Sequence, residues 1–146
     1  MCIRDRLSDE RVLVFGGNDA ERTFRKAHVL DLCAMAWSHP EETSGPAPPA
    51  RTGHAAVCLD GVRVLVLGGW DYAAEGSSEE YVYLDDGLFL LDTETWTWSK
   101  PRVRGALPSA RVGHSLVPLG DSLYCFGGRG EGGTALDDLH QLRLAL

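Results

Sequence analysis

The chain has 146 residues, 44% of them hydrophobic and 24% charged, and this globular composition argues against a disordered protein. Its formal net charge of −7 argues against nucleic-acid binding, which requires a basic surface. No stretch approaches the roughly 18 consecutive apolar residues that a membrane helix needs, so we expect no membrane association. Seventeen glycines and seven prolines indicate many short strands separated by turns, and therefore an all-β fold.

The first residues differ in character from the rest of the chain. The opening segment MCIRDR alternates in charge and has no apolar core, so it does not resemble a secretory signal. We expect residues 1–9 to lie outside the folded repeats, as a cloning or assembly junction would.

Four cysteines, Cys2, Cys33, Cys58 and Cys125, stand far apart and form no CxxC pair. A zinc site or a disulfide framework is therefore not expected, because isolated thiols of this kind usually behave as small hydrophobic residues. Since free thiols persist in reducing compartments, we expect an intracellular, cytoplasmic protein without a metal ion or other cofactor.

Two segments repeat with a period of 60 residues. The stretch from Gly45 to His54 reads GPAPPARTGH, the stretch from Gly105 to His114 reads GALPSARVGH, and six of the ten positions are identical. A fixed internal period of this kind is the sequence sign of a repeat architecture, in which each unit folds into the same supersecondary structure.

An apolar strand that ends in a glycine pair occurs three times, as VLVFGG, VLVLGG and LYCFGG. The first two runs are almost entirely aliphatic instead of alternating with polar residues, which is typical of strands covered on both faces. The glycine pairs mark points where a strand leaves its sheet and the backbone needs a positive φ or close contact with another segment.

An aspartate is followed six residues later by a tryptophan in two units, as Asp31 with Trp37 and Asp92 with Trp98. We expect the aspartates to hydrogen-bond into a tight turn and the tryptophans to seal one sheet against the next. Each unit therefore contains a strand after RxGH, a strand ending in GG, a strand ending in Asp, and a strand that carries Trp.

Together these ordered motifs resemble the kelch repeat, whose units are the four-stranded antiparallel blades of a β-propeller. The resemblance covers residues 10–146 and implies a kelch-type propeller of about two and a half blades. The residues that it assigns to the structural kelch motif are Gly16, Gly17, Asp31, Trp37, Arg51, Gly53, His54, Gly68, Gly69, Asp92, Trp98, Arg111, Gly113, His114, Gly127 and Gly128.

The units divide the chain into a partial blade at 10–50, a complete blade with an acidic loop insertion at 51–110, and a truncated partial blade at 111–146. A propeller needs roughly four to eight blades to close its ring, so we expect an incomplete ring. The chain then reads as a fragment of a longer protein whose remaining blades are its partners, with ring closure by association as the alternative.

Histidines and arginines recur at equivalent places, which points to blade geometry and not to catalysis. His54 and His114 share one place in two repeats, and His28 and His140 align with Phe89 at a strand packing position. The arginines that precede the GH pairs are expected to hold one blade against the next through their guanidinium groups. We therefore expect no catalytic and no metal-binding residues.

The repeats differ most after the glycine pair. The aspartate of the third strand, or Arg143 in its place, follows that pair after 14, 23 and 15 residues in the three units. The second unit thus carries an insertion with six acidic residues beside several aromatic ones, a composition that suits protein recognition. A mobile solvated loop is the alternative. The residues expected to bind a partner are Trp70, Asp71, Tyr72, Glu75, Glu79, Glu80 and Arg129.

Two classes of function fit the resemblance. A kelch propeller can act as a scaffold or substrate adaptor that binds a protein partner through loops on one rim, and the loops at 18–25 and 129–134 would share that rim with the insertion. One alternative is a fragment of an enzyme similar to galactose oxidase, which holds copper with tyrosine and histidine side chains, one tyrosine being cross-linked to a cysteine. The other is a fragment without function. No such trio stands out here, so we expect a binding module and not an enzyme.

Overall fold

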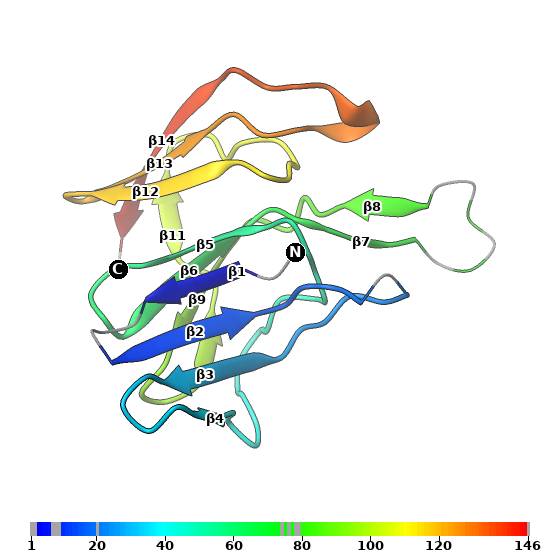
Figure 1. Cartoon of the computed structure of the whole chain (residues 1–146). Coiled ribbons are helices and arrows are strands. Elements are labelled where there is room, and N and C mark those ends of the chain that lie inside the picture. The colour runs from blue at the N-terminus through cyan, green and yellow to red at the C-terminus, as the bar shows by residue number, and fades with distance from the viewer. Residues whose placement is uncertain are drawn as a thin grey trace.

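The computed structural model describes residues 3–6, 10–19, 21–73, 75, 77 and 80–145 of the chain. It contains three four-stranded antiparallel sheets and one two-stranded ribbon, and its described residues form no helix longer than the 3-10 turn Glu131–Gly133. This confirms the all-β class and the four-stranded antiparallel unit. Figure 1 shows the three sheets following one another along the molecule, with the ribbon projecting to one side.

The first sheet has the strand order β1-β2-β3-β4. Its strands are β1 (Ile3–Arg6), β2 (Arg11–Phe15), β3 (Ala27–Asp31) and β4 (Ala36–Ser38). The expectation that residues 1–9 lie outside the folded repeats is wrong for residues 3–6, because β1 pairs with β2 over four residue positions. This short charged segment completes the first sheet through its backbone, a pairing that its sequence pattern did not predict.

The second sheet has the order β10-β9-β6-β5, and the ribbon β7-β8 extends from it. The ribbon lies at the place of the acidic insertion, so the inserted residues open as a β-hairpin between the second and third strands of this sheet. The strands are β5 (Ala55–Cys58), β6 (Arg63–Leu67), β7 (Trp70–Tyr72), β8 (Tyr81–Tyr83), β9 (Leu88–Asp92) and β10 (Thr97–Ser99).

The third sheet has the order β11-β14-β13-β12, and its outer strand comes from an unexpected place. The linker strand β11 (Arg102–Arg104), which precedes this sheet in the sequence, pairs with β14 (Leu139–Ala145). The other two strands are β12 (Ser115–Leu119) and β13 (Ser122–Phe126). The outer edge of β14 offers unpaired N–H and C=O groups, and the linker satisfies them. The unit expected to be truncated therefore has four strands.

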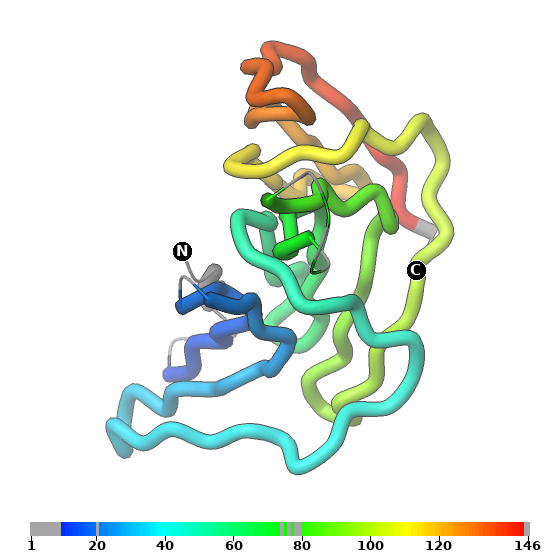
Figure 2. Tube along the Cα trace, turned by 90° about the vertical axis from the view of Figure 1, so that its right-hand side faces the viewer, coloured from blue at the N-terminus to red at the C-terminus, as the bar shows by residue number. Residues whose placement is uncertain are grey.

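The equivalent linker before the second sheet lies beside the fourth strand of that sheet, whereas β11 lies beside the third strand of its own. Ser44 pairs with the outer side of β10, donating its N–H to Trp96 at 3.1 Å and accepting the N–H of Trp98 at 2.8 Å. In both sheets the linker thus runs along the outermost edge. Figure 2 shows these two long linkers, in cyan and yellow, passing along the side of the molecule from one sheet to the next.

Two hydrophobic clusters hold the three sheets together, and β6 contributes to both. Its alternate residues Val64 and Val66 face the first sheet, whereas Leu65 and Leu67 face the third. All four are buried, which explains the continuous aliphatic run. From the neighbouring sheets, Leu13, Phe15, Ala27 and Val29 complete one cluster and Leu116, Leu123, Cys125 and Leu142 complete the other.

The outward faces of the first and third sheets are open among the described residues. Trp98 is 2% exposed because it packs on Phe15, whereas Trp37, at the same motif position in the first sheet, is 60% exposed. On the third sheet, the exposed apolar residues are Val117, Leu119, Phe126 and Leu139. Both faces are apolar, as the faces buried between sheets are, but no other sheet of the described residues covers them.

The two tryptophans give a matched test of this packing. We expect Trp98→Ala to lower the free energy of unfolding by about 3–5 kcal/mol, because it empties a filled core position. Trp37→Ala should change it by less than about 1 kcal/mol, since its side chain is largely solvated. Urea unfolding of both variants measures the difference, and equal losses would contradict the assignment of Trp98 alone to the core.

Candidate functional site

The sheets are joined where the glycine pair of one sheet meets the RxGH segment of the next. The N–H of Gly17 donates to the carbonyl of Arg51 at 2.9 Å, and the N–H of Gly69 donates to that of Arg111 at 2.9 Å. At Gly68, which has φ of +68°, a Cβ would lie 2.5 Å from the same Arg111 oxygen. Positive φ and this contact both exclude a side chain.

The guanidinium of Arg51 binds groups of its own sheet. It is fully buried, donates to the carbonyl of Gly68 at 2.9 Å and forms an ion pair with Asp86, while its Nε donates to Pro49 at 3.2 Å. The expectation that this side chain joins neighbouring blades is therefore wrong. The side chain fixes the strand ends within one sheet, and the backbone of the same residue makes the contact between sheets.

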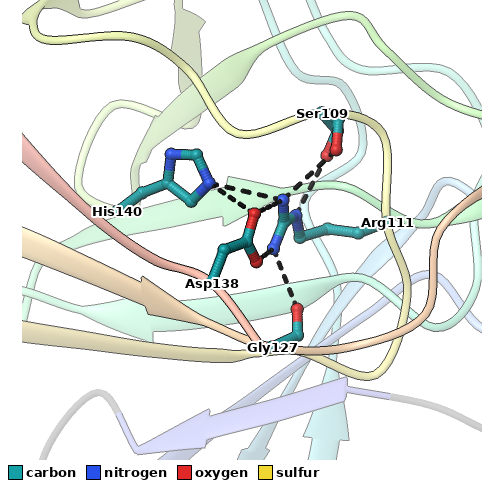
Figure 3. Close-up of polar contacts among 5 residues, drawn as sticks. All are labelled: Ser109, Arg111, Gly127, Asp138 and His140. Carbon is teal, nitrogen blue, oxygen red and sulfur yellow. Dashed lines mark hydrogen bonds and ion pairs between the residues drawn. The ribbon is translucent and has the colours of Figure 1, made fainter. Parts of the chain in front are cut away.

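Arg111 repeats this arrangement in the third sheet (Figure 3). It is 1% exposed and donates to the carbonyls of Ser109 and Gly127, each at 3.0 Å, and to both carboxylate oxygens of Asp138, at 2.6 and 2.8 Å. The hydrogen bond with Asp138 raises the pKa of Arg111, and the hydrogen bonds from Arg111 and His140 hold the pKa of Asp138 well below its usual range. Each buried arginine is thus paired with a carboxylate that lies just before the third strand of its own sheet.

Phe89 and His140 occupy equivalent strand positions in the second and third sheets, and each lies next to the ion pair of its own sheet. The guanidinium carbon of Arg51 lies 5.2 Å from the Phe89 ring centre, and His140 Nε2 lies 2.8 Å from the carboxylate of Asp138. This position was expected to serve packing alone. Phe89 also interacts with the ion pair of its sheet through its ring face, and His140 does so through a ring nitrogen.

His54 and His114 lie at the joint between sheets, where each ring approaches the glycine pair of the preceding sheet. His54 is buried against the Phe15 ring, with 5.4 Å between ring centres, and neither of its ring nitrogens is hydrogen-bonded to a described residue. Burial lowers the pKa of His54 to about 3 and that of His114 to about 4, with the neighbouring arginine contributing in each case. Both imidazoles are therefore neutral structural groups at neutral pH.

Removing the acidic partner of Arg111 tests the buried ion pair. We expect Asp138→Asn to lower the free energy of unfolding by about 1–3 kcal/mol, because the buried guanidinium loses a charge-assisted bidentate contact. The effect should stay below that of a fully buried pair, since the Asp138 side chain is 41% exposed. The adjacent exposed Asp137 provides the control, and Asp137→Asn should leave urea unfolding unchanged; equal effects of the two changes would contradict the role of the pair.

The buried histidines predict acid destabilisation. Because the folded-state pKa values lie below the usual 6.5, the unfolded chain binds protons first, and stability falls as pH drops below about 6.5 towards 4. Between pH 7.5 and 5 each histidine should remove about 2 kcal/mol from the free energy of unfolding. Urea unfolding at both pH values should show a smaller difference for His54→Leu than for the unchanged chain, whereas the exposed control His39→Asn should show the full difference.

The hairpin β7-β8 has one aromatic face. In its register Trp70 lies opposite Tyr83 and Tyr72 lies opposite Tyr81. The Trp70 ring centre is 5.2 Å from that of Tyr72 and 5.0 Å from that of Tyr81. Trp70 is half-buried and exchanges two backbone hydrogen bonds of 2.9 Å with Thr52, so it anchors the hairpin to the sheet instead of projecting freely.

A polar network also ties β7 to the rim loop of the first sheet. The hydroxyl of Thr23 hydrogen-bonds the Asp71 carboxylate, and the amide of Asn18 donates to the hydroxyl of Tyr72 at 3.4 Å. The Asp71 carboxylate also accepts the N–H of Tyr72 at 2.8 Å. Two of the residues expected to bind a partner, Asp71 and Tyr72, are therefore engaged within the molecule.

A groove of about 810 Å³ separates the other side of the hairpin from the rim loop of the third sheet. It brings together Glu80 and Arg129 from the expected binding residues and is also lined by Tyr81 and Tyr83. Glu131, which sequence reasoning did not single out, lies on the far wall within the loop expected to share this rim. Glu75 is exposed beyond the groove, and Glu79 lies outside the described residues.

A metal site, a disulfide and a membrane-spanning helix would each place requirements on the described part of the chain. No cluster of three or more His, Cys, Asp or Glu side chains there is arranged to hold a metal ion. Cys33, Cys58 and Cys125 are free thiols. Nor does any helix among these residues have the length and apolarity to cross a membrane.

Comparison with known proteins identifies the repeats. A family model described as the KLHDC2/KLHL20/DRC7 Kelch-repeats domain matches residues 2–145. The chain is 35% identical over 130 residues to human Rab9 effector protein with kelch motifs, covering 89% of this chain and 33% of that protein. It is 34% identical over 126 residues to bovine Kelch domain-containing protein 3, covering 86% and 31%.

The chain is also similar to a protein of Arabidopsis thaliana and to a solved structure. It is 33% identical over 118 residues to Acyl-CoA-binding domain-containing protein 4 of Arabidopsis thaliana, covering 80% of this chain and 16% of that protein. The solved structure titled Structure of YjhT matches with a TM-score of 0.73 at 20% identity, over 99% of this chain and 48% of that one. The chain thus spans a third or less of these curated relatives, and the motifs, the fold and the family match together show that it belongs to the kelch-repeat family.

Proposed function

We propose that this chain forms part of a kelch propeller that binds a protein partner through its rim loops, as a scaffold or substrate adaptor. The observation that carries the proposal is the groove between the hairpin β7-β8 and the loop at 129–136. The hairpin is the largest departure from the repeat, and loops held by a rigid scaffold are the usual carriers of binding function.

The framework under the groove supports this role. Ser109, in its lining, accepts a hydrogen bond from the buried Arg111, whose partner Asp138 also fixes the start of β14. The hairpin is held on its other side by Trp70 and Asp71. A groove whose walls are fixed by buried contacts can bind with little loss of conformational entropy.

We further propose that additional blades of a longer kelch protein cover the two open sheet faces. The relatives are about three or more times as long as the matched region, and the open faces repeat the pattern of the internal contacts. Burying apolar surface contributes roughly 25 cal/mol per Å², so covering these faces would stabilise the sheets that position the groove.

A copper enzyme similar to galactose oxidase is the less supported alternative. Cys125 lies in the core between the second and third sheets, where burial raises the pKa of its thiol. We therefore propose a non-catalytic role without a cofactor. An intracellular, cytoplasmic location accords with the free thiols and is proposed with it.

Charge reversal in the groove tests the binding role. The full chain serves as bait in a quantitative pull-down, and the combined variant Glu80→Lys with Glu131→Lys changes both walls of the groove. We expect partners to be depleted at least about tenfold, because the two lysines repel a ligand that the two carboxylates attract. The control Glu41→Lys with Glu94→Lys makes the same net change at exposed positions outside the groove and should retain them. Equal recovery with both variants would move the binding site away from this groove.

A further inference from the structure

The outer edge of β8 is free to accept another strand. The ribbon contains β7 and β8 only, and no other strand of the described residues pairs with β8. Ala73 donates to Glu80 at 3.0 Å and Leu84 donates to Gly69 at 2.9 Å, which makes the hydrogen-bonded positions of β8 residues 80, 82 and 84. In an antiparallel ladder the intervening residues direct their N–H and C=O groups to the opposite side. The backbone groups of Tyr81 and Tyr83 therefore point away from β7.

The two edges of the hairpin are not equivalent. Trp70, which lies opposite Tyr83, uses its outward N–H and C=O in two bonds to Thr52, so part of the outer edge of β7 is closed. The edge of β8 instead faces the groove, and Figure 1 shows β8 on the side of the hairpin nearest the third sheet. An incoming strand has access to β8 through the groove.

The wall of the groove opposite β8 is a turn that is hydrogen-bonded within itself. It consists of the turn from Arg129 to Thr134 together with Leu136, and three of the turn residues are glycines. This turn is closed on itself by the bonds from Gly130 to Thr134 at 2.9 Å and from Leu136 to Gly128 at 2.9 Å. Its own backbone is thus partly satisfied, whereas β8 still presents a ladder edge to the space between them.

The lining of the groove selects the charge of the occupant. Glu80, Asp85 and Glu131 are exposed carboxylates there, and none forms an ion pair with a described residue. Arg129 is the one basic residue among the lining positions that the structure describes. The surplus of negative charge attracts cationic side chains and repels acidic ones.

We infer that the groove binds an extended peptide segment rich in lysine or arginine, which adds as a strand to the free edge of β8. This inference rests on the proposed binding function and specifies its ligand. Backbone hydrogen bonds to Tyr81 and Tyr83 supply affinity, as in other cases of strand addition, and the three carboxylates supply selectivity. Tyr81 and Val82 are exposed on opposite faces of the ribbon, so alternate side chains of the peptide meet an aromatic and an aliphatic neighbour.

The test uses defined peptides and the full chain. A labelled peptide of about seven residues that alternates Lys and Thr is compared by fluorescence anisotropy with its Glu–Thr counterpart and with an N-methylated form of the Lys–Thr peptide. We expect the Lys–Thr peptide to bind at least about tenfold more tightly than either. The N-methylated form keeps the side chains and charge but cannot donate to an edge strand, so equal binding of this form would overturn strand addition.

Amide hydrogen exchange locates the contact. Added Lys–Thr peptide should slow exchange at Tyr81 and Tyr83, whose N–H groups face the groove, and should change Val82 little because its N–H already faces β7. The triple change Glu80→Gln, Asp85→Asn and Glu131→Gln should weaken binding about tenfold and flatten its salt dependence. The matched control Glu41→Gln, Glu42→Gln and Glu94→Gln should bind as the unchanged chain does.

The outcomes separate this inference from the proposed function. If groove charge reversal depletes protein partners but no peptide protects Tyr81 or Tyr83, the groove binds partners and strand addition is wrong. If the peptide binds and protects these residues while pull-down partners are unaffected, the strand edge is real and the proposed route of partner binding fails. Protection confined to residues outside β8 would overturn the inference directly.

Discussion

The structure depends on a close backbone contact between consecutive sheets. The carbonyl oxygen of Arg51 accepts the N–H of Gly17 and lies only 2.6 Å from where a Cβ of Gly16 would stand. The same contact recurs between the second and third sheets. It requires two glycines in sequence, fixes the distance between sheets at one end, and brings the apolar faces of β2, β6 and β13 into register. The repeated GG motif of one sheet and the RxGH motif of the next therefore form one contact between sheets.

Each joint also carries a buried cation, and this determines where the rim loops begin. A guanidinium removed from water must be compensated, and Asp86 and Asp138 do so from the start of the third strand. In the second and third sheets, the second strand, the third strand and the RxGH segment are therefore tied at the same end. The loops that leave this end start from fixed positions, whatever their length.

That arrangement explains how an insertion of several residues can sit on an unchanged framework. The hairpin β7-β8 replaces a short loop, yet the ion pair of its sheet matches the one in the third sheet. Its aromatic face packs on itself, and the bonds from Thr23 and Asn18 hold β7 against the first sheet. The other strand is left facing the groove, so one side of the insertion stabilises the rim and the other side remains available to a ligand.

The sequence by itself determined the all-β class, the kelch-type repeat, the strand that each motif follows and the placing of the insertion on the rim, because these depend on local periodicity and on motifs that recur in order. Only the tertiary structure decided that residues 3–6 and 102–104 complete two of the sheets, since edge pairing depends on which backbone lies near and not on side-chain pattern. It likewise decided that Asp86 pairs with Arg51, that Asp71 and Tyr72 hydrogen-bond to the rim loop of the first sheet, and that Glu80 and Arg129 share one groove. These contacts join residues far apart in the chain, and their partners follow from the packing of whole sheets.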